Sequence, residues 1–184
     1  MHETDEQLYD IFLTTGSEEA LLTLIRRHRG SLVLFINGFV HDMNTAEELA
    51  LDAFAEVAAG PTFFSDKSSF KTWLFSIGRN QALMYLRKIV PMDDIDESDV
   101  LGDASPEYDI LRDERNRMLY EGLRRINADS RRILILLYFE EMTPEEAASV
   151  MGKNRKQIYN LTERGKAALK EELLKMGFEY EIGV

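Results

Sequence analysis

The chain has 184 residues, of which 45% are hydrophobic, so it is long and apolar enough to bury a core. It contains no cysteine and only three scattered histidines, which leaves no basis for a disulfide framework or a Cys/His zinc site. The formal net charge is -11, which by itself argues against nucleic-acid binding, because DNA affinity comes largely from neutralising phosphates.

Three helices are predicted in the first half of the chain. Ser17 can cap the first, whose apolar residues recur every three or four positions up to Phe39. The sequence Thr-Ala-Glu-Glu at 45–48 predicts a capping box that starts a second helix, which runs to Gly60. A third helix is predicted from about 68 to 89, where a nearby proline stops it.

Residues 91–105 combine a proline, a glycine and clustered acids and show no helical apolar period. This composition predicts an acidic linker between two small helical domains, 1–90 and 106–184. We see no strand pattern and no repeat, so we expect an all-α fold.

Charge is unevenly distributed along the chain. Residues 91–110 carry eight acidic and no basic side chains. Two basic islands lie outside this stretch, with five basic residues in 67–88 and six in 153–170. Two basic surfaces joined by an acidic strap restore the possibility of nucleic-acid binding that the net charge argued against.

In the second half, a Ser-Pro pair at 105–106 predicts the start of a helix that runs to about Ile126. Asp129 or a neighbour then opens an apolar helix. A capping box with proline at the first helical position, 143–146, begins a short helix.

The residues that follow have the spacing of a helix-turn-helix. Gly152 ends the short helix, and Asn154 can cap a last helix that continues to about Lys175. A small residue at Ala148 allows close contact between the two helices, and apolar residues from Ile158 onwards hold the second helix in place.

The outward face of this second helix is basic and polar. Its cations can meet phosphates, while Asn160, Glu163 and Arg164 are of the types that read base edges in a major groove. Spacing alone leaves open an ordinary antiparallel helix pair with a solvated charged helix. The candidate DNA-binding residues here are Arg155, Lys156, Gln157, Tyr159, Asn160, Glu163, Arg164 and Lys166.

Several of these motifs resemble the extracytoplasmic-function (ECF) class of the sigma-70 family of RNA polymerase sigma factors. YFEEMTPEEAA at 138–148, followed by Gly152 and by KQIYNL at 156–161, resembles region 4, which reads the promoter's -35 element. DMNTAEELALDAF at 42–54 and SFKTWLFSIGRN at 69–80 resemble region 2. The resemblance implies a non-enzymatic protein that directs core RNA polymerase to promoters by -35 recognition and -10 melting.

The resemblance also implies where core polymerase binds. In the family, the helix that follows residue 45 docks on a coiled coil of the polymerase clamp, and its carboxylates face basic residues there. The amphipathic pattern alone would favour a merely solvated acidic edge. The candidate polymerase-binding residues are Glu47, Glu48, Leu49, Asp52, Ala53 and Glu56.

Region 2 of the family captures the -10 element as a melted single strand, which requires a cationic track and a pocket for an unstacked base. Phe63 and Phe64 could flank a flipped base, whereas Phe70, Trp73 and Phe75 recur at helical spacing and are predicted for the core. The candidate -10 residues are Phe63, Phe64, Ser65, Lys67, Ser68, Lys71, Arg79, Asn80, Arg87 and Lys88.

Four positions depart from the family pattern. Lys153 occupies a turn position that is usually apolar, and Leu51 replaces a commonly polar residue in the polymerase-binding helix. Leu161 and Glu163 stand where family members often carry basic or aromatic residues. These departures bear on which promoter sequence is read more than on the function itself.

The expected partners are the polymerase clamp and flap, promoter DNA and an anti-sigma factor, with no cofactor, metal or small-molecule substrate. A stand-alone helix-turn-helix regulator and a sigma-like interaction protein without promoter activity remain as alternatives. An enzyme has little support, since there is no glycine-rich phosphate loop and no catalytic grouping at a recognisable spacing.

Nothing in the sequence predicts membrane insertion or export. The longest apolar run, 31–40, is far shorter than the roughly 20 residues of a membrane span. The acidic N-terminus lacks the basic start of a signal peptide. We therefore expect a cytoplasmic protein.

Overall fold

The structure is a computed structural model that describes residues 3–60, 68–89 and 114–178. Within these ranges all regular structure is helical, as predicted. The predicted linker, 91–105, and the start of the helix predicted from 106 lie outside the described residues. No helix in the described part of the chain is long and apolar enough to cross a membrane.

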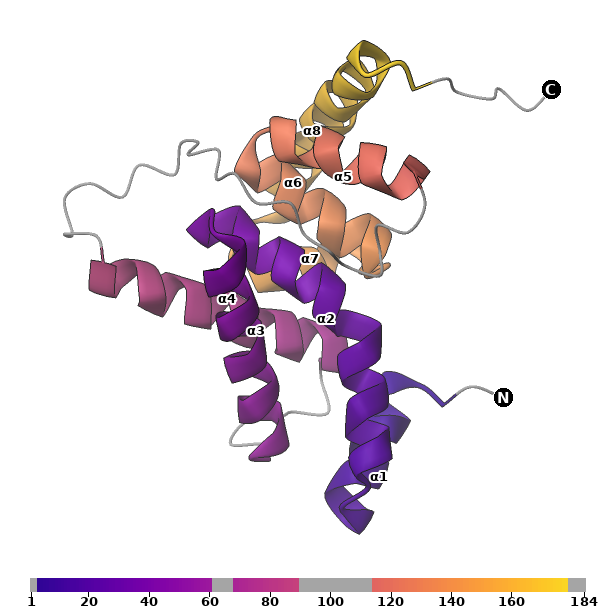
Figure 1. Cartoon of the computed structure of the whole chain (residues 1–184), viewed down its shortest axis with the longest axis vertical. Helices are drawn as coiled ribbons and strands as arrows, with labels where there is room; N and C mark the ends of the chain where they lie inside the picture. The colour runs from indigo at the N-terminus through magenta and orange to yellow at the C-terminus, as the bar shows by residue number, and fades with distance from the viewer. Residues whose placement is uncertain (1–2, 61–67, 90–113, 179–184) are drawn as a thin grey trace.

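The described part of the N-terminal half, 3–60 and 68–89, contains four helices (Figure 1). The predicted cap is confirmed at Ser17, whose side chain accepts a hydrogen bond from the Ala20 N–H. The end of the long third predicted helix is also confirmed. The helices are α1 (Asp5–Thr15), α2 (Glu18–Val40), α3 (Met43–Ala58) and α4 (Phe70–Ile89).

The capping box predicted at 45–48 is wrong. Helix α3 begins at Met43 and its N-cap is Asp42, three residues before Thr45, because the carboxylate of Asp42 accepts a hydrogen bond from the Thr45 N–H at 2.7 Å. Both residue types favour the N-cap position. The earlier start places Met43 and Ala46 in the core, so burial decides between the two caps.

Residues 114–178, the described part of the C-terminal half, contain five helical segments. Asn127, rather than Asp129, caps α6, since its side chain accepts hydrogen bonds from the N–H groups of Asp129 and Ser130. A short π-helix, η2, continues directly from α6. The segments are α5 (Glu114–Arg125), α6 (Ala128–Leu134), η2 (Ile135–Phe139), α7 (Pro144–Met151) and α8 (Arg155–Lys175).

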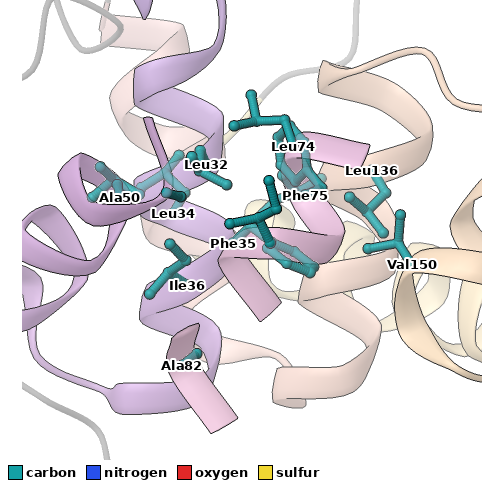
Figure 2. Packing of buried hydrophobic residues seen from close by; sticks show 14 of the residues in the cluster. Leu32, Leu34, Phe35, Ile36, Ala50, Leu74, Phe75, Ala82, Leu136 and Val150 are labelled. Atoms are coloured by element: carbon teal, nitrogen blue, oxygen red, sulfur yellow. The ribbon is translucent and has the colours of Figure 1, made fainter. Parts of the chain in front are cut away.

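One hydrophobic core runs through both halves of the chain. Phe35 of α2 and Phe75 of α4 are fully buried with ring centroids 5.3 Å apart. Figure 2 shows Leu136 of η2 and Val150 of α7 on the far side of Phe75. Burying each such side chain contributes about 1.5–3 kcal/mol, so the two halves stabilise each other in this arrangement.

The aromatic residues predicted for the core lie there. Phe70 and Phe75 are fully buried, which confirms the prediction. Trp73 is half-buried and packs against the core, with its ring centroid 5.4 Å from that of Tyr9. Tyr9 belongs to α1, a helix that the sequence analysis did not predict.

Candidate nucleic-acid and polymerase interfaces

The helix-turn-helix forms as its local signals predicted. Thr143 and Glu146 make a reciprocal capping box at the start of α7. Gly152 ends α7 with a φ of 62°, in the left-handed region that glycine adopts without steric cost. Asn154 and Gln157 form a second box at the start of α8, with N–H to side-chain oxygen distances of 2.8 and 2.9 Å.

The buried face of α8 determines which of its side chains remain outside. Ile158 is buried, and a β-carbon at Gly165 would lie 3.0 Å from Cβ of Ser130, so glycine permits the close approach of α8 to α6. The opposite face leaves all eight candidate DNA-binding side chains exposed. These are Arg155, Lys156, Gln157, Tyr159, Asn160, Glu163, Arg164 and Lys166.

Two of the cations on this exposed face form ion pairs with nearby carboxylates. Arg155 Nη1 lies 3.2 Å from Glu145 Oε1, and Lys166 Nζ lies 2.9 Å from Glu163 Oε1. Exposed pairs of this kind contribute only about 0–1 kcal/mol. A DNA phosphate can therefore replace either carboxylate at little energetic cost.

Helix α3 presents an acidic stripe to solvent. Glu48, Asp52 and Glu56 follow one another at four-residue intervals and are all exposed. Glu47 does not belong to this stripe, because its Oε1 forms an ion pair with Arg29 Nη2 at 2.7 Å. The remaining two candidates, Leu49 and Ala53, lie in the hydrophobic core, where they support the helix from beneath rather than reach a partner.

Five of the ten candidate -10 residues lie on α4, and Ser68 lies two residues before it. Asn80, Arg87 and Lys88 are exposed. Ser68, Lys71 and Arg79 are half-buried. The other four candidates, Phe63, Phe64, Ser65 and Lys67, lie outside the described residues.

Comparison with known proteins identifies both halves. The profile of sigma-70 region 2 matches residues 24–89, and the profile of sigma-70 region 4 matches residues 116–169. The ECF RNA polymerase sigma factor SigX of Bacillus subtilis is 26% identical over 85% of this chain and 84% of its own length. The chain belongs to the ECF class of sigma-70 family sigma factors.

Other relatives agree with this assignment. The RNA polymerase sigma-H factor of Pseudomonas aeruginosa is 29% identical over 88% of this chain and 91% of its own length. The sigma factor RpoE of Bartonella quintana, solved in complex with the anti-sigma factor NepR, has the same fold with a TM-score of 0.63. It is 24% identical, and the match covers 86% of this chain and 98% of that one.

Two of the four departures from the family pattern, Lys153 and Leu51, have clear structural settings. Lys153 lies in the turn between α7 and α8, and its Nζ is 2.9 Å from Oδ2 of Asp129 at the start of α6. A polar contact thus replaces the usual apolar one. Leu51 is 56% exposed on α3, next to the acidic stripe, and adds an apolar side chain to that face.

Regions 2 and 4 of this sigma factor meet at Glu140, which sequence reasoning did not single out. The wide π-turn of η2 and the left-handed φ of 52° at Glu141 direct Glu140 inward, where it is buried. Its carboxylate accepts hydrogen bonds from Ser31 and from His28 Nδ1, the latter at 2.7 Å. Its backbone carbonyl accepts one from Lys71.

His28 bridges two carboxylates across this contact. Its Nε2 lies 2.8 Å from Asp5 Oδ2, on the side opposite Glu140. Burial by itself would lower the pKa of His28, but the hydrogen bonds to Asp5 and Glu140 outweigh that effect and raise the pKa to about 9. The imidazolium therefore donates to both carboxylates at neutral pH. Among the described residues, no group of three or more acidic, histidine or cysteine side chains is arranged to hold a metal ion.

Two further contacts join the regions. Glu146 of the α7 capping box accepts hydrogen bonds from Ser69 at 2.6 Å and from Thr72, both at the start of α4. Burial would raise the pKa of Glu146, but the hydrogen bonds from Ser69 and Thr143 lower it. On the other side, Arg132 Nη1 of α6 donates to the carbonyl of Gly38 at 2.6 Å.

Helix α1 precedes the residues that match sigma-70 region 2 and is hydrogen-bonded to that region. The Tyr9 hydroxyl donates to the carbonyl of Val57 at 3.0 Å, and Glu6 Oε1 accepts a hydrogen bond from the Phe70 N–H at the start of α4. The helix begins with a capping box of Thr4 and Gln7. This Thr-x-x-Gln pattern was the available signal for α1.

Proposed function

We propose that this ECF sigma factor initiates transcription by reading the -35 element with α8 and capturing the melted -10 element with α4, while α3 docks on the polymerase clamp. The exposed polar face of α8, held by two capped turns and a buried opposite face, carries the proposal. As a member of its family, the chain binds core RNA polymerase and promoter DNA and is not an enzyme.

Promoter contact by α8 is tested with a holoenzyme reconstituted from core polymerase and promoters selected from a randomised duplex pool. Arg164→Ala removes an exposed cation that can make bidentate contact with a guanine, which is worth about 1–3 kcal/mol. We therefore expect promoter binding to weaken about five- to 150-fold. Lys170→Ala, an exposed cation on the same helix outside the candidate set, is the matched control. Equal effects of the two changes would contradict the assignment of α8.

The acidic stripe of α3 supports docking on a basic polymerase surface. Asp52→Arg reverses an exposed charge at the centre of the stripe, so we expect at least tenfold weaker binding to core polymerase. Asp10→Arg makes the same change on the exposed face of α1 and controls for net charge. Unchanged core binding by the Asp52 variant would refute the role of α3.

We further propose a region 2 domain at 1–90, an acidic linker at 91–105 and a region 4 domain at 106–184 that contacts the polymerase flap. The profile matches lie inside these two domains. Because core polymerase is the partner, the proposed location is the cytoplasm. The complex of the Bartonella factor with NepR supports a dedicated anti-sigma protein for this chain as well.

A further inference from the structure

Helix α1 contacts both ends of the chain segment that joins α3 to α4. At one end, the Tyr9 hydroxyl donates a hydrogen bond to the carbonyl of Val57, in the last turn of α3, at 3.0 Å. At the other end, Oε1 of Glu6 accepts a hydrogen bond from the N–H of Phe70, the first residue of α4, also at 3.0 Å. Glu6 and Tyr9 are three residues apart and therefore lie on the same face of α1. One helix face thus fixes the end of α3 relative to the start of α4.

Both contacts bind backbone groups that helix ends leave without a partner. The last carbonyls and the first N–H groups of an α-helix have no acceptor or donor within the helix. At the start of α4, Ser69 Oγ accepts a hydrogen bond from the Thr72 N–H at 3.3 Å, while the Phe70 N–H is bound by Glu6. A carboxylate at this position also interacts favourably with the positive end of the helix dipole. Glu6 therefore stabilises the first turn of α4 from another helix.

Packing and ion pairs hold α1 in place against its neighbours. Tyr9 is only 1% exposed, and its ring centroid lies 5.3 Å from that of Phe70. On the other side, the carboxylate of Asp5 pairs with both Arg27 and His28 of α2, each at 2.8 Å. The two hydrogen bonds to α3 and α4 are therefore made by a helix whose own position is fixed.

The segment between these two contacts carries much of the candidate -10 surface. Residues 58–69, named here the α3–α4 connection, include five of the ten candidate -10 residues, and Lys71 follows in the first turn of α4. A melted strand is captured only when cationic and stacking groups are presented to it together. A segment whose two ends are fixed has fewer conformations to lose on binding, so less of the binding energy is spent on ordering it.

We propose that α1 is a positioning element for capture of the melted -10 strand, with Glu6 and Tyr9 as its positioning residues. Neither belongs to the candidate DNA-binding or polymerase-binding residues, so both act through the ends of α3 and α4. The match to sigma-70 region 2 begins at residue 24, after α1, so this helix lies outside the matched region. The inference rests on the proposed capture of the -10 element by region 2.

Three substitutions and a control separate positioning from a general effect on stability. Glu6→Ala removes the acceptor for the Phe70 N–H, whereas Glu6→Gln keeps a side-chain oxygen in the same place and is the conservative rescue. Tyr9→Phe removes only the hydroxyl that binds the other end of the connection. Asp10→Ala is the matched control, because Asp10 is an exposed acid on the same helix.

Each variant is assembled into holoenzyme with core polymerase and titrated with two DNA probes. One probe is a single strand that carries the -10 element, and the other is a duplex that carries only the -35 element. Both are taken from promoters that the wild-type holoenzyme selects from a randomised pool. A loss of folded protein lowers the apparent affinity for both probes by the same factor, so the ratio of the two affinities reports positioning alone.

We expect Glu6→Ala and Tyr9→Phe each to weaken binding of the single strand at least about fivefold, the factor that corresponds to the about 1 kcal/mol of one hydrogen bond. Binding of the -35 duplex and of core polymerase should not change. Glu6→Gln should recover most of the affinity for the single strand, and Asp10→Ala should behave as the wild type.

Unchanged binding of the single strand by both Glu6→Ala and Tyr9→Phe would overturn the positioning role. Equal losses on the two probes would overturn it as well, because they would show a general loss of structure. A Glu6→Gln variant as weak as Glu6→Ala would contradict the hydrogen bond to Phe70 as the cause. A wild-type holoenzyme that binds the -35 duplex but not the single strand would instead contradict the proposed function of region 2.

Discussion

His28 makes the stability of this sigma factor depend on pH in a window where few other groups titrate. Its pKa rises from the ordinary value of 6.5 to about 9 in the folded protein. The folded state therefore binds the proton more tightly than the unfolded chain. A difference of about 2.5 pKa units corresponds to about 3 kcal/mol at 1.36 kcal/mol per unit. This contribution is fully present below pH 6.5 and is lost as the pH rises through about 9.

The measurement is the free energy of unfolding by urea at a series of pH values, for wild type and for His28→Gln. Between pH 6 and pH 10 we expect the wild type to lose about 3 kcal/mol more than the variant. His41→Asn, at the left-handed cap of α2, removes another histidine from the same helix and controls for histidine loss. Parallel pH profiles of wild type and His28→Gln would refute the reasoning, because they would show that no proton is held between Asp5 and Glu140.

Three further predictions concern stability, each measured by denaturant or thermal unfolding. Phe75→Ala should lower the free energy of unfolding by about 3–5 kcal/mol, because the ring is fully buried in the core shared by both regions. A loss below about 1 kcal/mol would contradict the shared core. Gly165→Ala should lower the free energy of unfolding by about 1–3 kcal/mol, because the added methyl group forces α8 away from α6. A variant more stable than the wild type would contradict that contact. Tyr9→Phe should lower the free energy of unfolding by about 1 kcal/mol, since it removes the hydroxyl that donates to the carbonyl of Val57 and leaves that oxygen only the Gly60 N–H at 3.2 Å. No loss would show that α1 is not docked as described.

Local signals predicted most helix ends correctly. Ser17, the Thr143 box and Gly152 all act within four residues of the helix end that they define, so the sequence suffices to identify them. The start of α3 was predicted wrongly because two good caps compete, and the burial of Met43 and Ala46 selects between them. Helix α1 was missed although its capping box was readable.

Sequence patterns also predicted part of the candidate site. Helical periodicity was enough to predict that the listed side chains of α8 are exposed and that Phe70 and Phe75 are buried. The same periodicity put Leu49 and Ala53 beneath the carboxylates of α3, and both lie in the core while Glu48 and Asp52 face solvent. The boundaries of the two domains and the roles of the individual side chains remain predictions.

The sequence by itself determined the helical class, the helix-turn-helix, the family and the basic and acidic faces, because all of these are encoded in short patterns of neighbouring residues. Only the tertiary structure placed His28 against Glu140, 112 residues away, and Lys71 against the same residue. Such contacts depend on how whole helices pack, and no local pattern specifies the partner of a buried charge. The packing of region 4 over the start of α4 was accessible only from the tertiary structure.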